Sequence, residues 1–333
     1  MLNGKTVLIT GGTGSFGRRF TETALKRFEP KRLIVFSRDE LKQSEMHAHF
    51  GEQDYPNIRY FIGDVRDRDR LYRAFDGVDI VVHAAALKQV PAAEYNPIEA
   101  VKTNVLGAAN VIDAAIDRGV EKVIALSTDK AASPISLYGA TKLCSDKLFV
   151  AANSYSGTHR TRFSVVRYGN VVGSRGSVIP LFQQRRKTGK LPITDPRMTR
   201  FWITLDRGVQ FVLQCLEEMK GGEIFVPKIP SMKLIDLARV IGPDCDMEIV
   251  GRRPGEKLHE VMVSEDDAQN TLEYDEFYAI LPTVRNWNQD QIRDNDGGRP
   301  CPEGFRYSSE TNTPWLTVAE LEQIIGPSKA PLD

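Results

Sequence analysis

The chain has 333 residues, and its 44 lysines and arginines balance 44 aspartates and glutamates, so its formal net charge is zero. A neutral chain lacks the bulk electrostatic attraction that nucleic acids and anionic membranes exert, which excludes both as main partners. The length exceeds that of one typical domain and indicates a large α/β domain with a smaller one. The four cysteines are widely and irregularly spaced, so we expect neither a metal site nor a disulfide framework.

Nothing in the sequence points to a membrane or to secretion. No apolar run approaches the length of a membrane span. The first predicted strand begins within a few residues of the N-terminus, which leaves no room for a signal peptide. We therefore expect a soluble cytoplasmic protein.

A glycine-rich turn follows the first predicted strand. Residues 5–10 form a short apolar, β-branched run, and a helix is predicted over 18–28. The glycines between them let the backbone turn sharply and bring amide N–H groups close to a pyrophosphate. A turn with a purely structural role is the alternative interpretation. The predicted cofactor contacts are Gly11, Thr13, Gly14, Ser15, Phe16 and Gly17.

The end of the second predicted strand, 32–36, bears on the type of cofactor. An acidic residue here typically binds the ribose 2′-hydroxyl of NAD, whereas cationic side chains suit the 2′-phosphate of NADP. A guanidinium can bind such a phosphate through two hydrogen bonds. Asp39 could instead turn inwards to the ribose, but we favour NADP. The predicted contacts are Ser37, Arg38, Asp39, Glu40, Leu41 and Lys42.

Two more strands, predicted over 58–62 and 79–83, are also followed by residues suited to a dinucleotide. Asp64 either accepts a hydrogen bond from an adenine amino group or caps the next helix. Small residues after the fourth strand let a flat dinucleotide pass close to the backbone, whereas His83 fits a core position better than a catalytic one. The predicted contacts are Asp64, Val65, Ala84, Ala85 and Ala86.

A long helix is predicted over 99–118. It contains Thr103 and Asn104, and a buried Asn needs hydrogen-bond partners, so we place both residues beside the cofactor. Lys88, which precedes this helix, could meet a phosphate or a sugar.

The polar groups with the clearest chemical meaning are Thr128, Asp129, Lys130, Tyr138 and Lys142. The first three follow a buried strand predicted over 123–126, at the edge where open parallel sheets bind ligands. The other two lie four residues apart in a helix predicted over 136–155, so they share one face. We expect the Lys142 ammonium to lower the pKa of the Tyr138 phenol from about 10 towards neutrality. Such a phenol exchanges a proton with a sugar hydroxyl, although the spacing alone also fits ordinary surface neighbours.

The rest of the chain predicts a second ligand site and a smaller lobe. A sixth strand over 163–167 ends in a glycine-rich loop, 168–177. Beyond it the pattern becomes irregular, with helices predicted over 178–188, 204–219, 233–241 and 318–325, short strands near 193, 224–226 and 247–250, and a long loop over 285–302. Basic residues of this part could clamp a diphosphate or form a solvated face: Arg197, Arg200, Arg252, Arg253 and Lys257.

These elements predict an α/β fold, with a Rossmann-type doubly wound parallel sheet and a smaller C-terminal lobe. The NADP-binding domain is assigned to residues 1–177. Residues 178–333 are assigned mainly to the substrate-binding lobe, with the chain able to cross between the two parts.

The motifs resemble a known family. Gly11-x-x-Gly14-x-x-Gly17 with Tyr138-x-x-x-Lys142 resembles the extended short-chain dehydrogenases/reductases, which act on nucleotide-activated sugars with bound NAD or NADP. Within them, Thr128-Asp129-Lys130 and the segments SRDELKQ (37–43), HAAALKQVP (83–91) and DPRMTRFWIT (195–204) resemble the inverting UDP-N-acetylglucosamine 4,6-dehydratases. Those enzymes begin pseudaminic acid biosynthesis in bacteria that glycosylate flagella or surface polysaccharides. The resemblance covers residues 3–282 and YSSETNTPWL at 307–316, although Ser133 and Ser136 stand where close relatives are expected to carry Asn.

The resemblance implies that water is removed from a sugar by internal redox. Tyr138 would take the C4 hydroxyl proton as a hydride leaves C4, and Thr128 would steady the same oxygen. Asp129 would be the acid at C6 and Lys130 the base at C5, after which the hydride returns to C6 and C5 gains a proton on the opposite face. Burial shifts both pKa values in the required direction, whereas pairing of Asp129 with Lys130 opposes both shifts.

The resemblance also implies a tightly bound NADP that is regenerated in every cycle, a UDP-sugar as substrate, and a homo-oligomer. The family pattern gives these candidate UDP-sugar contacts: Lys88, Asn170, Val178, Ile179, Thr194, Arg200, Arg253 and Glu256.

Three alternatives remain at this stage. A UDP-N-acetylhexosamine 4-epimerase needs only Tyr138, Lys142 and a rotating 4-keto intermediate. A non-catalytic NADP-binding regulator would have little reason to keep an acid and a base beside that pair. A retaining dehydratase could use the same residues, because the outcome at C5 depends on which face of the ring a proton donor reaches.

Overall fold

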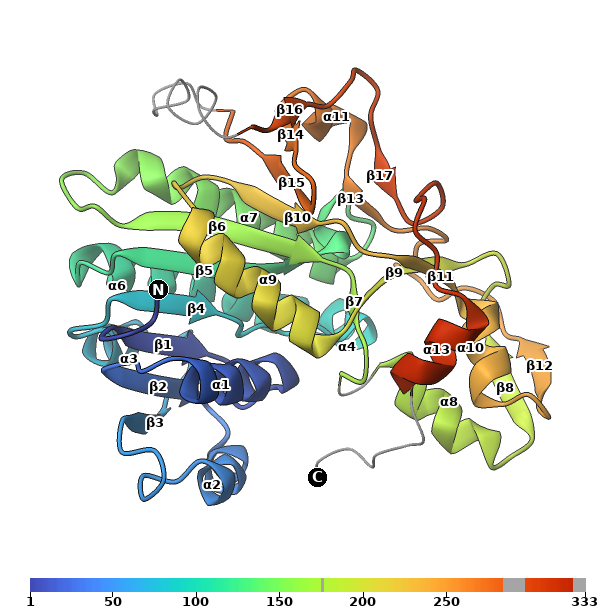
Figure 1. The fold of residues 1–333 in the computed structure, drawn as a ribbon, viewed down its shortest axis with the longest axis horizontal. Helices are drawn as coiled ribbons and strands as arrows, with labels where there is room; N and C mark the ends of the chain where they lie inside the picture. Colours follow the sequence, from blue (N-terminus) through green and yellow to red (C-terminus); the bar gives the residue numbers. More distant parts are fainter. Residues whose placement is uncertain (175–176, 284–296, 326–333) are drawn as a thin grey trace.

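A computed structural model describes residues 1–174, 177–283 and 297–325, which form a large α/β body with a smaller lobe beside it (Figure 1). Within these residues the main sheet has ten strands. In order across the sheet they are β16 (Arg299–Pro300), β14 (Thr271–Glu273), β15 (Phe277–Ile280), β10 (Ile224–Pro227), β6 (Arg162–Tyr168), β5 (Lys122–Thr128), β4 (Ile80–His83), β1 (Thr6–Thr10), β2 (Arg32–Ser37) and β3 (Ile58–Ile62).

From β10 to β3 every pair of neighbouring strands is parallel, and β15, β14 and β16 extend the sheet in antiparallel fashion. The order β3-β2-β1-β4-β5-β6 is that of a Rossmann fold. Helices cover both faces of the parallel strands, so these strands consist of nearly continuous apolar residues, as in Val7-Leu8-Ile9 of β1. The predicted fold class is confirmed.

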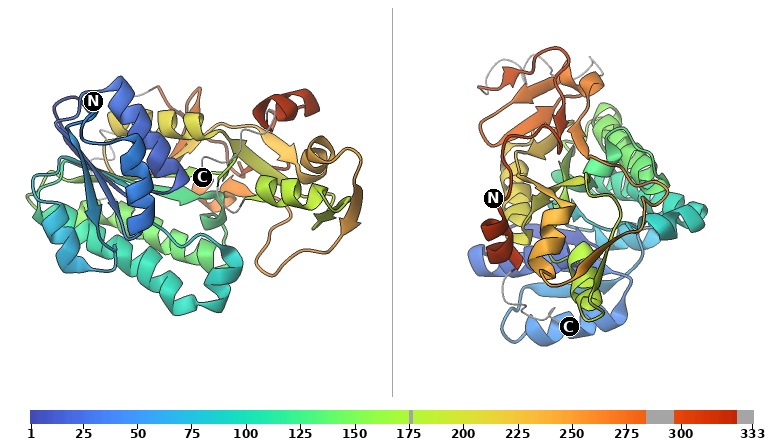
Figure 2. Two further views of the ribbon diagram at one scale, coloured as in Figure 1. Left: turned by 90° about the horizontal axis from the view of Figure 1, so that it is seen from below. Right: turned by 90° about the vertical axis from the view of Figure 1, so that its right-hand side faces the viewer.

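Helices lie on both faces of the sheet, as Figures 1 and 2 show. One face is covered by α1 (Ser15–Arg27) and α9 (Leu205–Glu218), which pack against each other. The other face carries α3 (Arg68–Ala74), α6 (Gly107–Asp117) and α7 (Leu137–Tyr155). The short helix α2 (Glu40–His49) packs beside β3.

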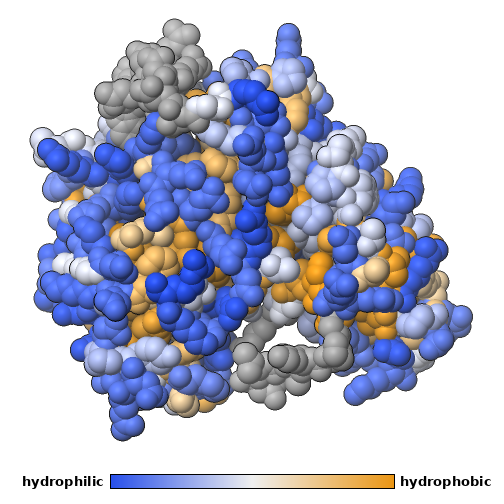
Figure 3. Space-filling model, in the orientation of Figure 1, coloured by the Kyte–Doolittle hydropathy of each residue, from blue (hydrophilic) through white to orange (hydrophobic). Residues whose placement is uncertain are grey.

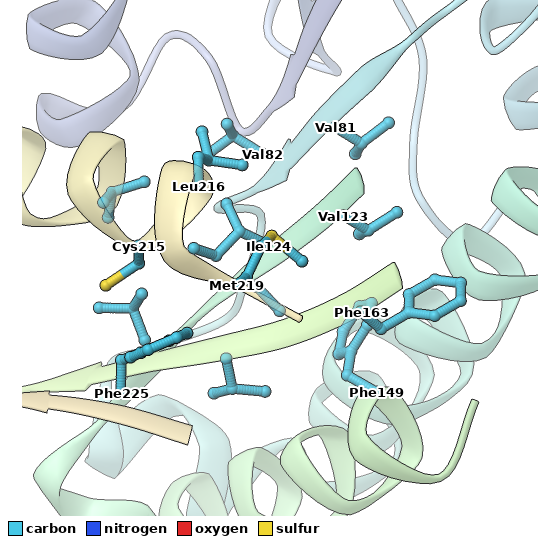
Figure 4. Close-up of a cluster of buried hydrophobic side chains, with 14 of the residues drawn as sticks. Val81, Val82, Val123, Ile124, Phe149, Phe163, Cys215, Leu216, Met219 and Phe225 are labelled. Carbon is cyan, nitrogen blue, oxygen red and sulfur yellow. The ribbon is translucent and has the colours of Figure 1, made fainter. Parts of the chain in front are cut away.

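The core of the large body joins parts of the chain that are far apart in sequence. Figure 4 shows Ile124 of β5 and Phe225 of β10 close to Leu216 of α9 and to Met219, the residue that ends this helix. All four are buried. Because α9, β10 and β14–β16 follow residue 177, the large body contains residues from both sides of that position.

The lobe contains a three-stranded sheet, β11 (Ser231–Lys233), β9 (Thr199–Ile203) and β7 (Asn170–Val171), and a two-stranded one, β12 (Asp246–Ile249) and β8 (Lys190–Ile193). The helices α8 (Val178–Arg186), α10 (Leu234–Ile241) and α13 (Val318–Ile325) surround a second apolar core that includes Leu191 and Leu237. A further pair of strands, β13 (Val261–Val263) and β17 (Tyr307–Ser308), lies between the lobe and the large sheet (Figure 1). Figure 3 shows a mostly hydrophilic face, with apolar side chains gathered where the lobe meets the body.

The helix predicted over 99–118 is continuous but not regular. It consists of α5 (Pro97–Val101), a π-helical turn (Lys102–Leu106) and α6. A π-turn places an extra residue in the helix and is frequent at functional sites. Here it carries Thr103 and Asn104.

Other short elements complete the chain: α4 (Val90–Tyr95), the 3₁₀ turn η2 (Asp129–Ala131) and α11 (Glu265–Ala268). Arg175, Gly176 and most of the loop predicted over 285–302 lie outside the described residues. Among the residues that are described, no helix is long and apolar enough to span a bilayer.

Candidate active site

A cavity of about 690 Å³ opens where the parallel strands end, and the large sheet and the lobe both contribute to its lining. Almost all the predicted cofactor, catalytic and substrate residues line it. The exceptions are Glu40, Leu41, Asn104, Asp129 and Thr194. One continuous cavity therefore joins the glycine-rich turn to the Tyr138 region and to Arg253 of the lobe.

The glycine-rich turn leaves room for a ligand against the backbone. Gly11 has φ +65°, and a Cβ atom there would lie 2.8 Å from the main-chain nitrogen of Ala85, so only glycine fits. Gly14 is the N-cap of α1 and provides no side-chain hydrogen bond to the first turn. The N–H groups at the start of α1 can therefore bind a phosphate, as the sequence predicts.

The side chains at the end of β2 differ in role: some stabilise the fold, and others line the cavity. The Asp39 carboxylate accepts a hydrogen bond from the Lys42 main chain as the N-cap of α2, and it also pairs with the Lys42 ammonium. Arg38 lines the cavity, with 57% of its side chain exposed. Glu40 begins α2, and Leu41 is 70% exposed, which explains why neither lines the cavity.

Asp64 and Asn104 have different surroundings. The N-cap of α3 is Asp67, which excludes the capping role considered for Asp64. Asp64 instead pairs with Arg66, at 2.7 Å, and with Arg38, at 3.6 Å. The buried Asn104 amide donates to the Thr141 hydroxyl and to a main-chain carbonyl, so it has a structural role behind the residues that line the cavity.

The turn η2 holds the acid and base candidates directly after β5. The Lys130 ammonium lies 3.0 Å from the Asp129 carboxylate, which also accepts a hydrogen bond from the Thr128 hydroxyl. Gly139 allows η2 to pack this closely on α7, since a Cβ there would lie 2.2 Å from the Lys130 carbonyl oxygen. The second Asp129 oxygen is buried and has no hydrogen-bond partner among the described residues.

Burial and neighbouring charges compete in setting the pKa values of Asp129 and Lys130, and a different one of the two prevails at each residue. Burial raises the pKa of the fully buried Asp129 carboxyl, despite the opposing charge of Lys130. For Lys130, burial alone would lower the pKa, but the carboxylates of Asp129 and Glu260 outweigh it, and the pKa is raised. The shift at Asp129 is in the direction that an acid requires, but the expected lowering of the Lys130 pKa is wrong: the two carboxylates keep Lys130 an ammonium.

The pKa expected for Tyr138 is wrong. Burial raises the pKa of the phenol to about 12, and the cation that opposes this most strongly is Lys130. Lys142 is itself buried, which lowers the pKa of its own ammonium against the opposing charge of Asp146. The i,i+4 spacing correctly placed both side chains in the cavity lining, but it could not reveal that η2 brings another ammonium to the phenol.

His83 is a core residue, as expected. It is buried, and its Nδ1 lies 2.8 Å from the Thr10 hydroxyl oxygen. Burial lowers the pKa of its imidazole to about 3, so the ring is neutral.

The lobe contributes polar groups of two kinds. Asn170 and Ser177 line the cavity, and the Asn170 Oδ1 and Ser177 Oγ atoms are buried without a hydrogen-bond partner among the described residues. The Arg200 guanidinium is instead held by the carbonyls of Thr199 and Leu258, which leaves less of it for a diphosphate.

The predicted basic cluster of the lobe does not form one clamp. Arg197 pairs with Asp195 at the surface, while Lys257 donates to the Ala132 carbonyl. Arg253 lines the main cavity, as Lys88 does. The Thr194 hydroxyl donates a hydrogen bond to Met198 Sδ, and Thr194 does not line the cavity.

Glu260 also lines the cavity, although it was not among the residues predicted from the sequence. Its carboxylate lies 3.3 Å from the Lys130 ammonium and is almost fully buried. A charged residue followed by the apolar run Val261-Met262-Val263 was the available signal, because acidic residues are rarely buried without a partner.

The residues that line the cavity fit a nicotinamide dinucleotide at one end and a nucleotide-sugar at the other. Besides the turn at Gly11, the buried Thr103 hydroxyl has no hydrogen-bond partner among the described residues. A dinucleotide lying along the strand ends would reach both positions.

Comparison with known proteins gives consistent relatives. A relative from Campylobacter jejuni named UDP-N-acetylglucosamine 4,6-dehydratase (inverting) is 55% identical over 331 residues, which is 98% of each chain. A UDP-glucose 4-epimerase from Rickettsia massiliae is 44% identical over 329 residues, 96% of this chain and 95% of its own. The resemblance drawn from the sequence motifs is confirmed.

Solved structures agree on the fold. The X-ray structure of Pen from Bacillus thuringiensis has a TM-score of 0.89 and 37% identity and covers 98% of both chains. DesIV, a dTDP-glucose 4,6-dehydratase from Streptomyces venezuelae solved with NAD and TYD bound, has a TM-score of 0.68 and 25% identity, over 76% of this chain and 86% of its own. The family model described as polysaccharide biosynthesis protein matches residues 7–282, and the chain therefore belongs to that family.

Proposed function

We propose that the protein is a C5-inverting UDP-N-acetylglucosamine 4,6-dehydratase that works with a tightly bound NADP. The product would be UDP-2-acetamido-2,6-dideoxy-β-L-arabino-hexos-4-ulose. The observation that carries this proposal is the placement of Thr128, Lys130 and Tyr138 in one cavity, with Asp129 bonded directly behind them. A Tyr-Lys pair alone explains oxidation at C4, but only an added acid and base explain loss of water.

In the proposed mechanism the chain's residues move three protons. Tyr138 accepts the proton of the C4 hydroxyl as the phenolate, which must form first because burial raises the pKa of this phenol, while Thr128 hydrogen-bonds the same oxygen. The resulting C4 ketone acidifies the C5–H bond, and Lys130 removes that proton as the neutral amine, after passing its own proton to the Asp129 carboxylate 3.0 Å away. Asp129, whose pKa is raised by burial, donates its proton to the C6 hydroxyl, which leaves as water. A proton then reaches C5 from the opposite face.

The cofactor is proposed to lie between the glycine-rich turn and Tyr138. When bound, it supplies a reversible acceptor for the hydride that leaves C4 and returns to C6. Gly11 and the start of α1 would hold its pyrophosphate, and Arg38 would bind the 2′-phosphate that distinguishes NADP from NAD. Since the redox state is restored in each cycle, the cofactor need not dissociate.

The proposal extends to the biological setting through the resemblance. The product would enter pseudaminic acid biosynthesis, which supplies flagellin glycosylation or surface polysaccharide. The enzyme would act as a homo-oligomer in the cytoplasm. No membrane or nucleic-acid partner is required by this chemistry.

The decisive experiment is to incubate the purified protein with UDP-N-acetylglucosamine in deuterated water. We expect a product that has lost the mass of water and carries deuterium at C5, with the C5 configuration assigned by NMR couplings. An isomer without mass loss would identify an epimerase, a retained C5 configuration would identify the retaining enzyme, and no turnover would favour a binding protein. Mass spectrometry of denatured enzyme, purified without added nucleotide, should find NADP.

Arg38→Ala is expected to weaken NADP binding by about 10-fold to 100-fold while changing NAD binding little, because a charge-assisted contact contributes about 1.5–3 kcal/mol. Affinities of both cofactors for apoprotein, measured by calorimetry, test this. Arg59→Ala removes another partly exposed arginine and serves as the control. Equal NADP affinity in wild type and Arg38→Ala would remove the argument for NADP.

A further inference from the structure

Glu260 is a buried carboxylate to which the mechanism above assigns no role. It directly precedes β13, and only 1% of its surface is exposed. One oxygen lies 3.3 Å from the Lys130 ammonium and 3.7 Å from Arg200 Nε, and the other lies 4.0 Å from Lys257 Nζ. That second oxygen has no hydrogen-bond partner among the described residues.

The main chain of Glu260 is fixed from behind by the C-terminal segment. Its N–H donates to the Ser309 hydroxyl, and its carbonyl accepts from the Ser309 N–H. The same hydroxyl lies 2.7 Å from the Thr199 hydroxyl, next to Arg200 on β9. The main chain at Glu260 and at Thr199, next to Arg200, is therefore held by one buried polar contact through Ser309.

Glu260 is also a permanent negative charge. Burial would raise its pKa, but the cations of Lys130, Arg200 and Lys257 outweigh burial and lower it. Arg200 and Lys257 donate to main-chain carbonyls and so keep their positions. The two carboxylates of Asp129 and Glu260 thus flank the same amine, which also faces Tyr138, Thr128 and Arg200.

We propose that Glu260 is a positioning residue for Lys130, an inference that rests on the proposed dehydratase function. With Asp129 it directs the amine towards the cavity, and it stabilises the ammonium that forms at C5 deprotonation. Lys130 first passes its ammonium proton to the Asp129 carboxylate, 3.0 Å away, and becomes the neutral amine. The C5–H bond then breaks, its electron pair moves into the C4 carbonyl to give an enolate, and the proton forms a new bond to Lys130 Nζ. The proton of Asp129 then leaves with the C6 hydroxyl as water.

Different roles for Asp129 and Glu260 explain why two carboxylates contact one lysine. Asp129 must give up its proton to C6, so its charge changes during the reaction. Glu260 keeps its charge because its own cations are fixed. A constant carboxylate beside a base that becomes a cation plays the part that the buried Asp plays beside the His of a Ser-His-Asp triad.

Glu260→Gln tests the proposal, because it keeps the shape and removes the charge. We expect kcat to fall about 100-fold and C5 deuterium exchange to fall with it, while KM for UDP-N-acetylglucosamine changes little. Glu260 raises the pKa of both Asp129 and Lys130, so both limbs of the kcat–pH profile should move to lower pH. NMR titration of ¹⁵N-labelled lysine should show a lowered Lys130 pKa without any turnover.

Two further variants make the result decisive. Glu260→Asp keeps the charge at a longer distance and should keep the pH profile of the wild type at a reduced rate. If Glu260→Gln does not fold, a wild-type rate in Glu260→Asp overturns the proposal. Glu223→Gln changes another buried carboxylate, bound to Ser164 and to main-chain N–H groups, and should leave the pH profile unchanged. An unshifted profile for Glu260→Gln would reduce Glu260 to a structural ion pair. Wild type that forms no dehydrated product would instead overturn the proposed function, and this inference with it.

Discussion

Lys130→Ala is expected to abolish dehydration, with a loss in kcat of about 100-fold to 10,000-fold, the usual range for removing a general base. The amine lies in the cavity lining between the carboxylates of Asp129 and Glu260. Exchange of the C5 proton with solvent should disappear together with loss of water. Cofactor retention should be unchanged, because the glycine-rich turn and Arg38, which are proposed to hold the cofactor's phosphates, are not altered.

The measurement is NMR of the sugar in deuterated water, with mass spectrometry of the bound nucleotide. Lys147→Ala changes an exposed lysine on α7, the helix against which η2 packs; it is the control and should behave as wild type. Turnover by Lys130→Ala close to that of the control would remove Lys130 from the mechanism.

Arg167→Met is expected to lower the free energy of unfolding by about 3–5 kcal/mol, because it leaves a buried carboxylate without its main cation. Arg167 is 2% exposed and Asp146 is 1% exposed, and their side chains lie 3.4 Å apart. Asp146 also accepts a hydrogen bond from Ser127, and Arg167 donates to the Met262 carbonyl. This contact ties α7 to β6 and to β13 behind the catalytic residues.

The loss should depend on pH in a defined direction. Burial already raises the pKa of Asp146, and Arg167 opposes that effect, so the substitution raises this pKa further. A carboxyl with a raised folded-state pKa costs stability once the pH rises through that pKa, and costs none below the unfolded value of about 3.9. The deficit of Arg167→Met should therefore be greatest near neutral pH and should shrink in acid.

Urea unfolding at several pH values checks this expectation. Arg207→Met, which removes an exposed pair with Glu276, is the control and should change stability by less than about 1 kcal/mol at any pH. A deficit that is small or independent of pH would mean that Asp146 finds another partner, with Lys142 the nearest candidate.

Much of the fold was predictable because its signals are local. Apolar runs identify β1, β2 and β4–β6, and the glycines after β1 identify the start of α1. The strands β9, β11 and β13 were missed, since each is short and its partners are distant in sequence. Ser136, noted only as a departure from the expected Asn, is the N-cap that starts α7.

The sequence predicts which residues belong to the site, but it does not predict how their charges interact. Residues at strand ends, such as Thr128 and Lys130, reach the cavity because parallel strands finish at one edge. The ammonium that acts on Tyr138 could not be identified, because it depends on how η2 folds back on Gly139. Glu260 was missed for a related reason: Lys130, the partner that brings it into the site, is more than a hundred residues away along the chain, and Arg200 lies in β9.

The path of the chain after the lobe limits how this protein could be recombined with its relatives. Its sheet is completed by β10, β15, β14 and β16, all encoded downstream of the first lobe strands. A chimera that exchanged everything after residue 177 would replace the strand that pairs with β6 as well as the sugar pocket. If the new strand did not pair with β6, an open β edge prone to self-association would remain. Changes of sugar specificity in such a scaffold are therefore expected to come from substitutions within loops rather than from swapping whole halves.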